Sequence, residues 1–266
     1  MPGHNDWYTI QDNPFVIDFK PYNFTPMLFD DAANYTAKLI AEKYDNIYIG
    51  LSGGLDSEYV AKVFLRNNIP FTPIIWKDPY CRETDYALYF CKKNNLNFHL
   101  IEKDLLDPVV FNSLKAAAKK YNSQDIVAAL NIILIKTVEK HNGHFIMSTG
   151  MPIVSGENYP DPIDTSKTEF MKCEFYIELD QTNHPGSFFC YTPEILYSYT
   201  TSLNTNLSVQ EAKCNLYNIE FRPKLKPYHI GMVFDVENDL SKEVYNYGDL
   251  NTFKKIFDEA NLNPFT

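Results

Sequence analysis

An apolar strand followed at once by a glycine-rich turn is the feature that most constrains how this chain can fold. Residues 47–51 are apolar and partly β-branched, and they lead directly into Ser52-Gly53-Gly54-Leu55-Asp56-Ser57. Helical spacing follows, with Val60, Val63 and Phe64 on one face. The segment therefore predicts a strand, a tight loop and a helix, with the loop at the carboxyl end of the strand.

The residue types in this loop favour binding of a phosphate group. Gly53 and Gly54 have no Cβ, so backbone N–H groups can approach an anion closely. The helix that follows directs the positive end of its dipole at the same place. The hydroxyls of Ser52 and Ser57 can donate to phosphate oxygens. Asp56 would repel a bare phosphate, but a carboxylate there makes sense if it holds Mg²⁺, which takes hard oxygen ligands and bridges to phosphates.

Residues 52–57 match the Ser-Gly-Gly-x-Asp-Ser motif, and the chain resembles the PP-loop (N-type) ATP pyrophosphatases over about residues 45–150. This family includes asparagine, NAD, GMP and argininosuccinate synthetases and several tRNA-modifying enzymes. The motif lacks the Gly-Lys-Ser/Thr ending of a Walker A loop. The resemblance implies that ATP and Mg²⁺ are the cofactors, and that the loop grips the pyrophosphate released when the α-phosphate is attacked.

The resemblance also implies which residues surround the nucleotide. The expected cofactor-binding set lies at the ends of three strands and comprises Leu51, Ser52, Gly53, Gly54, Asp56, Ser57, Ile75, Trp76, Lys77, Ser148, Thr149 and Gly150. The end of the second strand would contact adenine, partly through its backbone. Trp76 fits equally well as a core side chain.

The expected catalytic residues are Ser52, Asp56, Ser57 and Lys224. Lys224 belongs to the basic stretch 222–227, and the resemblance suggests a distal cation that covers the transferring phosphates. An ordinary solvated loop is the alternative for this stretch. The expected metal ligands are Asp56 and Glu157, with Asp161 as an alternative to Glu157 and solvated loop acids as the other interpretation.

Strands and helices alternate along residues 45–150. Apolar strands are expected at 47–51, 71–76, 97–102 and 144–148, with a helix after each of the first two, at about 57–66 and 82–93, and two helices, 107–121 and one opening at Ser123, after the third. This order predicts an α/β fold of the HUP or Rossmann-like type, a parallel sheet with helices on both faces. Ligands bind such sheets beyond the carboxyl ends of the strands, which is where the loop lies.

Three regions are expected along the chain. Residues 1–44 form an N-terminal arm and a helix, with the arm extended and the helix at 30–44. Residues 45–165 form the PP-loop ATP pyrophosphatase core. Residues 166–266 form an irregular, mixed C-terminal substrate or cap region packed on the core. Within it we expect a strand at 173–179, a polar loop at 180–184 that is a candidate substrate contact, and helices opening at Thr192, at the capping box Ser208–Glu211 and at Asp249. His184, taken alone, is expected at the surface.

Composition argues against several classes of protein. The formal charge is −10, with 24 Lys and Arg against 34 Asp and Glu, which argues against a nucleic-acid partner. Five cysteines without CxxC spacing argue against a disulfide scaffold or a structural zinc site. No leader segment and no apolar stretch of about 18 residues is visible, so a cytoplasmic protein without a membrane partner is expected. Formation of a homo-oligomer is left open.

The sequence therefore predicts an AMP-forming ligase that adenylates a carboxylate or amide oxygen of a small molecule, for attack by an amine or ammonia. Two alternatives remain. The first is an adenylate-forming sulfurtransferase acting on a nucleobase, which requires a persulfide-bearing cysteine near the loop. The second is a nucleotide-binding protein without turnover.

Overall fold

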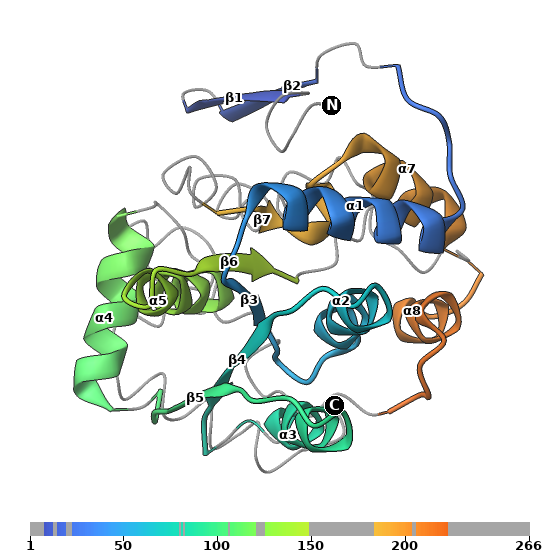
Figure 1. Ribbon diagram of the computed structural model, residues 1–266. Coiled ribbons are helices and arrows are strands. Elements are labelled where there is room, and N and C mark those ends of the chain that lie inside the picture. Colours follow the sequence, from blue (N-terminus) through green and yellow to red (C-terminus); the bar gives the residue numbers. More distant parts are fainter. Residues whose placement is uncertain are drawn as a thin grey trace.

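A five-stranded parallel sheet lies at the centre of the structure, a computed structural model that describes residues 8–12, 15–19, 23–79, 81, 83–105, 107–120, 126–148, 184–203 and 206–222 (Figure 1). Every neighbouring pair of strands is parallel. The strand order is β5 (His99–Glu102), β4 (Thr72–Lys77), β3 (Ile47–Gly50), β6 (His144–Met147) and β7 (Gly186–Ser187). The predicted α/β class is confirmed.

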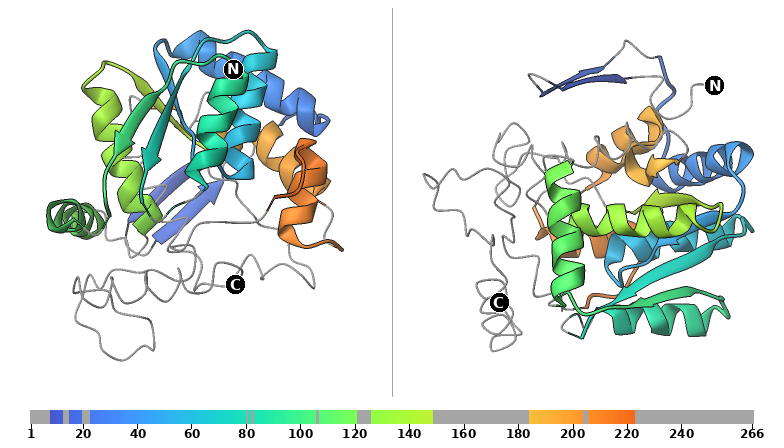
Figure 2. Two further views of the ribbon diagram at one scale, coloured as in Figure 1. Left: turned by 90° about the horizontal axis from the view of Figure 1, so that it is seen from below. Right: turned by 90° about the vertical axis from the view of Figure 1, so that its left-hand side faces the viewer.

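Helices cover both faces of this sheet, as the sequence predicted. In Figure 1, α4 (Pro108–Lys120) and α5 (Ile126–Glu139) lie to the left of the strands, and Figure 2 shows the same pair from that side. The opposite face carries α1 (Phe29–Lys43), α2 (Leu55–Arg66) and α3 (Thr84–Lys93). Since β3 lies between β4 and β6, the loop after it is near the middle of the carboxyl edge of the sheet.

Asparagines in a left-handed conformation end several of these helices. Asn68, Asn95, Asn142 and Asn218 follow α2, α3, α5 and α8 (Val209–Tyr217), with φ between 50° and 56°. Asparagine tolerates this conformation better than most residues with a side chain. Each of the first three therefore allows a short turn from a helix into the start of the next strand.

An aromatic cluster fastens the C-terminal helices to the sheet. Phe29, Tyr59, Phe189, Tyr199 and Tyr217 come from α1, α2, the short 3₁₀ helix Phe188–Cys190, α7 (Pro193–Ser202) and α8, and they form one buried group. Tyr59 and Tyr217 stack with ring centroids 4.5 Å apart. This burial fixes α8 against α2, next to the glycine-rich loop.

Two of the three helix starts predicted in the C-terminal region are confirmed. The Thr192 side chain accepts a hydrogen bond from the Ile195 N–H at the start of α7. Ser208 and Glu211 form the capping box of α8. The strand expected at 173–179 and the helix expected after Asp249 lie outside the described residues.

Two elements were not predicted. The arm was expected only to be extended, and within it β1 (Tyr8–Asp12) and β2 (Phe15–Phe19) form an antiparallel hairpin, which Figures 1 and 2 show apart from the main sheet. Strand β7 comes from the part of the chain assigned to the cap, and it has only two residues. Within the described ranges, no helix combines the length and apolar character that a membrane crossing demands.

The fold makes Phe64 on α2 a test of the core. Phe64 is completely buried, and we expect Phe64→Ala to lower the free energy of unfolding by about 3–5 kcal/mol because it removes buried contacts and leaves a cavity. Tyr89→Ala on α3, which is 66% exposed, is the matched control and should cost about 1 kcal/mol or less. Urea unfolding of both variants checks this, and equal losses would contradict the described core.

Candidate functional site

The glycine-rich loop joins β3 to α2 through a backbone conformation that requires glycine. The Leu51 N–H donates to the Ile74 carbonyl at 2.9 Å, so pairing with β4 continues up to the loop. Gly53 then has φ +86°, and a Cβ there would lie 1.9 Å from the Glu83 carbonyl oxygen. The loop thus passes so close to the backbone before α3 that no side chain fits at Gly53.

The two motif serines hold the shape of this loop. The Ser52 N–H donates to Ser57 Oγ at 3.2 Å, and Ser57 Oγ donates to the Gly54 carbonyl at 3.1 Å. The Gly54 N–H reaches Ser52 Oγ at 3.3 Å, and the two hydroxyl oxygens are 3.2 Å apart. In this structure the hydroxyls bond to the loop itself, and their donation to a phosphate stays a prediction.

Several backbone N–H groups at the start of α2 have no acceptor among the described residues. Gly54 is the N-cap and supplies no side-chain cap, and no described group accepts from the N–H of Gly53, Leu55, Asp56 or Ser57. The first N–H groups of a helix need partners from outside the helix, and together with the helix dipole they favour an anion. This is the feature that an anion-binding loop requires.

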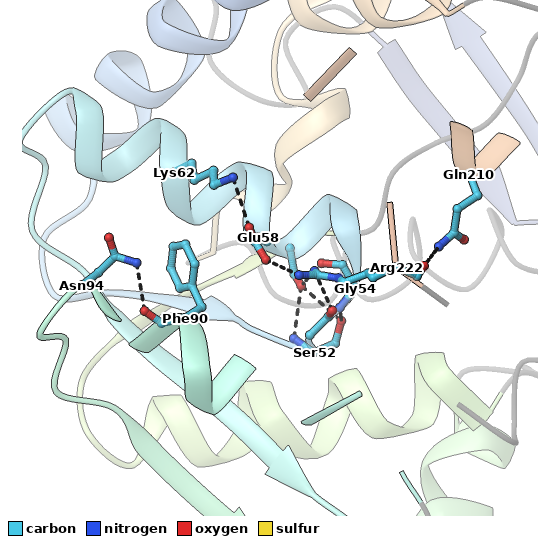
Figure 3. Close-up of polar contacts among 10 residues, drawn as sticks. Ser52, Gly54, Glu58, Lys62, Phe90, Asn94, Gln210 and Arg222 are labelled. Atoms are coloured by element: carbon cyan, nitrogen blue, oxygen red, sulfur yellow. Dashed lines mark hydrogen bonds and ion pairs between the residues drawn. The ribbon is translucent and has the colours of Figure 1, made fainter. Parts of the chain in front are cut away.

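Arg222 reaches the loop from the segment after α8 (Figure 3). One of its guanidinium nitrogens, Nη1, donates to Glu58 Oε2 at 2.6 Å, and Nη2 donates to the Gly53 carbonyl at 2.8 Å. The guanidinium also lies 4.7 Å from the ring centroid of Tyr86. The side-chain amide of Gln210 donates a hydrogen bond to the Arg222 carbonyl. Arg222 therefore fixes the orientation of the Gly53 peptide.

Two residues of α8 bind the carboxylate of Asp56, one through an ion pair and one through a hydrogen bond. Lys213 Nζ lies 2.7 Å from Asp56 Oδ2, and the Tyr217 hydroxyl donates to Asp56 Oδ1 at 2.6 Å. Burial by itself lowers the pKa of Lys213, but the Asp56 carboxylate and Tyr199 outweigh it and the net pKa is raised. Burial, and then Asp56, raise the pKa of Tyr217. Lys213 therefore stays charged at neutral pH, and Tyr217 stays a hydrogen-bond donor.

These contacts do not favour a metal ion on Asp56. Mg²⁺ needs several oxygen ligands at about 2.1 Å in near-octahedral geometry. Both Asp56 oxygens already face an ammonium or a phenol, and two like unit charges 4 Å apart repel by about 4 kcal/mol at an effective dielectric constant of 20. Within the described ranges, no group of three or more His, Cys, Asp or Glu side chains is placed to hold a metal. The metal at Asp56 stays a prediction that this arrangement does not support.

The other predicted nucleotide contacts lie at the ends of β4 and β6. Ser148 donates to the Gly50 carbonyl at 3.2 Å, so the end of β6 is beside the loop strand. The Ile75 side chain is fully buried between α2 and α3, which leaves only its backbone for a ligand. Trp76 is buried and its indole N–H has no partner among the described groups. Lys77 is paired with Glu102, which raises the pKa of Lys77.

Some predicted residues are outside the described ranges or lie elsewhere. Thr149, Gly150, Glu157, Asp161 and Lys224 are not among the described residues. His184 is a correction, because it is buried rather than at the surface, and its Nδ1 accepts from the Phe145 N–H at 3.0 Å. Phe145 pairs with Tyr48 toward the amino-terminal half of β6, so His184 lies away from the loop. Burial is the main cause that lowers the pKa of His184.

Sequence reasoning missed Lys213 and Tyr217, and it named Arg222 only as part of a basic stretch. Lys213 and Tyr217 are four residues apart and so share one face of α8, which is the only local signal that they act together. Their partner Asp56 is 157 residues away from Lys213 in the sequence. One amino-acid sequence by itself gives no sign of a contact between residues so far apart in the chain.

No protein-family model matches the sequence, and no curated protein is similar to it in sequence. Solved structures do resemble the chain. An NMN synthetase from Francisella tularensis has 14% identity and a TM-score of 0.38, over 76% of this chain and 90% of that one. An NH3-dependent NAD synthetase from Campylobacter jejuni has 20% identity and a TM-score of 0.35, over 72% and 93%. A predicted subunit of tRNA methyltransferase from Methanocaldococcus jannaschii has 11% identity and a TM-score of 0.34, over 67% and 92%.

At these TM-scores and identities the likeness does not assign an activity. The strand order and the loop geometry of the chain itself define the candidate site.

The geometry of Gly53 makes it the most sensitive position of the loop. We expect Gly53→Ala to destabilise the protein by about 1–3 kcal/mol, because a side chain is strained at this φ and meets the Glu83 carbonyl. Gly54→Ala is the matched control, since Gly54 has φ −74°, which alanine adopts freely. Thermal unfolding checks this, and equal stability of the two variants would show that the loop has another conformation.

Proposed function

We propose that this chain is an ATP-dependent synthetase of the PP-loop ATP pyrophosphatase class, which transfers AMP from ATP to a carboxylate or amide oxygen of a small molecule. The observation that carries the proposal is a set of N–H groups at the start of α2 that have no acceptor in the described part of the chain, beside a backbone turn that only glycine permits. The loop lies at the carboxyl edge of a parallel sheet, where such sheets bind ligands.

The reaction divides into two displacements. The substrate oxygen attacks the α-phosphorus of ATP, and the bond from this phosphorus to the bridging oxygen breaks, so pyrophosphate leaves with that electron pair. The backbone N–H groups of Gly53, Leu55, Asp56 and Ser57, together with the hydroxyls of Ser52 and Ser57, stabilise the charge that develops on pyrophosphate. An amine or ammonia then attacks the activated carbon, AMP leaves, and the nitrogen loses a proton.

The protein contributes mainly position and electrostatics in this proposal. Arg222 keeps the Gly53 peptide oriented, and Ser57 ties the two ends of the loop together. Lys224, Thr149 and Gly150 remain proposed contacts of the phosphates and the nucleotide. Mg²⁺ would neutralise the charge of ATP as its counter-ion, since Asp56 is already paired with Lys213.

The sulfurtransferase alternative requires an activated cysteine, and the described cysteines do not offer one. Cys81, Cys91, Cys190 and Cys214 are all buried. Burial raises the pKa of Cys91 to about 11, and burial also raises the pKa of Cys214. A thiol with such a pKa is almost fully protonated at neutral pH and is a poor nucleophile. Amide or amidine formation is therefore the favoured chemistry.

The direct test is formation of AMP and pyrophosphate from ATP. The protein is incubated with ATP, Mg²⁺, ammonium and pools of small carboxylic acids, and we expect acid-dependent release of both products. Ser57→Ala should lower the rate by about 10²-fold or more because it unties the loop and removes a donor to the leaving group. Ser113→Ala is the matched control, since this hydroxyl bonds to the Val109 carbonyl on the exposed side of α4.

Two results would count against the proposal. Equal product formation by wild type and Ser57→Ala would place the chemistry away from the loop. Measurable ATP binding, with ATP intact after long incubation with every acid pool, would instead support a binding protein without turnover.

Replacement of single cysteines distinguishes amide or amidine formation from sulfur transfer. We expect Cys91→Ser and Cys214→Ser to retain release of AMP, because neither thiol is ionised or exposed in the folded protein. Cys173→Ser completes the set. Loss of product in one of these variants, with the melting temperature preserved, would favour sulfur transfer.

A further inference from the structure

The start of α2 carries two acidic side chains, and the C-terminal segment neutralises both. Asp56 pairs with Lys213 at 2.7 Å, and Glu58 pairs with Arg222 at 2.6 Å. Both cations come from residues 206–222, which approach the loop on the α8 side (Figures 1 and 3). The two pairs cancel in charge, so the acids of the motif helix present no net negative field to an incoming phosphate.

Lys213 is held at Asp56 more firmly than a surface lysine would be. Its side chain is only 12% exposed, and α8 is fixed to α2 by the stacked rings of Tyr59 and Tyr217. Tyr217 also donates to the second oxygen of Asp56, so the carboxylate has a donor or cation on each side. Lys62, by contrast, pairs with Glu58 from the surface of the same helix.

A carboxylate next to a phosphate site needs a cation, and the sequence alone suggested that Mg²⁺ supplies it. In the structure an ammonium of the chain is already there. We propose that Lys213 is the built-in cation of this loop: it neutralises Asp56, so the N–H groups of residues 53–57 bind a diphosphate group without a divalent ion on Asp56. This inference rests on the proposed function. Lys213 is a positioning residue, since it acts through Asp56.

The charges give each variant a different signature. Lys213→Met leaves Asp56 as an unpaired negative charge beside the phosphates, so binding should weaken without metal and recover when a divalent ion takes the vacated place. Asp56→Asn combined with Lys213→Met restores neutrality, so binding should return without metal. Lys213→Arg keeps the charge and should behave like wild type.

The experiment is calorimetric titration of the full chain with inorganic pyrophosphate, first in EDTA and then in Mg²⁺. We expect wild type and Lys62→Met, the surface control, to bind in EDTA. Lys213→Met should bind roughly ten-fold more weakly or worse in EDTA, with most of the loss recovered in Mg²⁺. The double variant should bind within about three-fold of wild type in EDTA, because the two changes compensate.

Other results overturn the inference and distinguish it from the proposed function. If wild type binds pyrophosphate only in Mg²⁺ and Asp56→Asn removes that dependence, Asp56 is a metal ligand, the inference fails and the proposed function stands. If wild type binds neither pyrophosphate nor ATP in either buffer, the proposed function fails. If Lys213→Met melts below the titration temperature, pyrophosphate binding by the double variant and by Lys213→Arg tests the inference instead. Loss of binding in EDTA by Lys213→Arg, at an unchanged melting temperature, would contradict the role of charge.

Discussion

The close passage of Gly53 under the Glu83 carbonyl is the constraint on which the rest of the site depends. A Cβ at Gly53 would lie 1.9 Å from that oxygen, so the turn out of β3 exists only with glycine at this position. The turn directs the chain into α2 with its first N–H groups unpaired among the described residues. Arg222 holds the Gly53 carbonyl on the other side, so the peptide is fixed by two parts of the chain that are far apart in sequence.

The C-terminal segment is part of the site rather than an appendage to it. Its helix α8 is buried through aromatic stacking on α2, and the same helix carries Lys213 and Tyr217 to Asp56. Packing and electrostatics therefore act together, since the stacked rings fix α8 in the position from which Lys213 and Tyr217 meet Asp56. Breaking one partner of such a pair costs about 3–5 kcal/mol in general, because it leaves an uncompensated charge.

The sequence was sufficient for the fold and for the position of the loop, because both depend on local patterns. Alternating apolar strands and amphipathic helices predicted the parallel sheet, and Ser208 with Glu211 predicted the start of α8. The hairpin β1–β2 was missed, although the Asn13-Pro14 dipeptide between its strands is a turn signal. The contacts of Lys213 and Arg222 have no local signal, since they depend on how α8 docks. His184 was misjudged for the same reason, because its burial comes from packing near β6.

The most direct measurement is a crystal structure of the protein with a non-hydrolysable ATP analogue and Mn²⁺, with anomalous scattering used to locate the metal. The account predicts the terminal phosphates within hydrogen-bonding distance of the N–H groups of residues 53–57, and Mn²⁺ on phosphate oxygens while Asp56 keeps Lys213. Phosphates bound elsewhere, with the loop N–H groups facing protein or water, would contradict the central claim that this turn holds the pyrophosphate half of ATP.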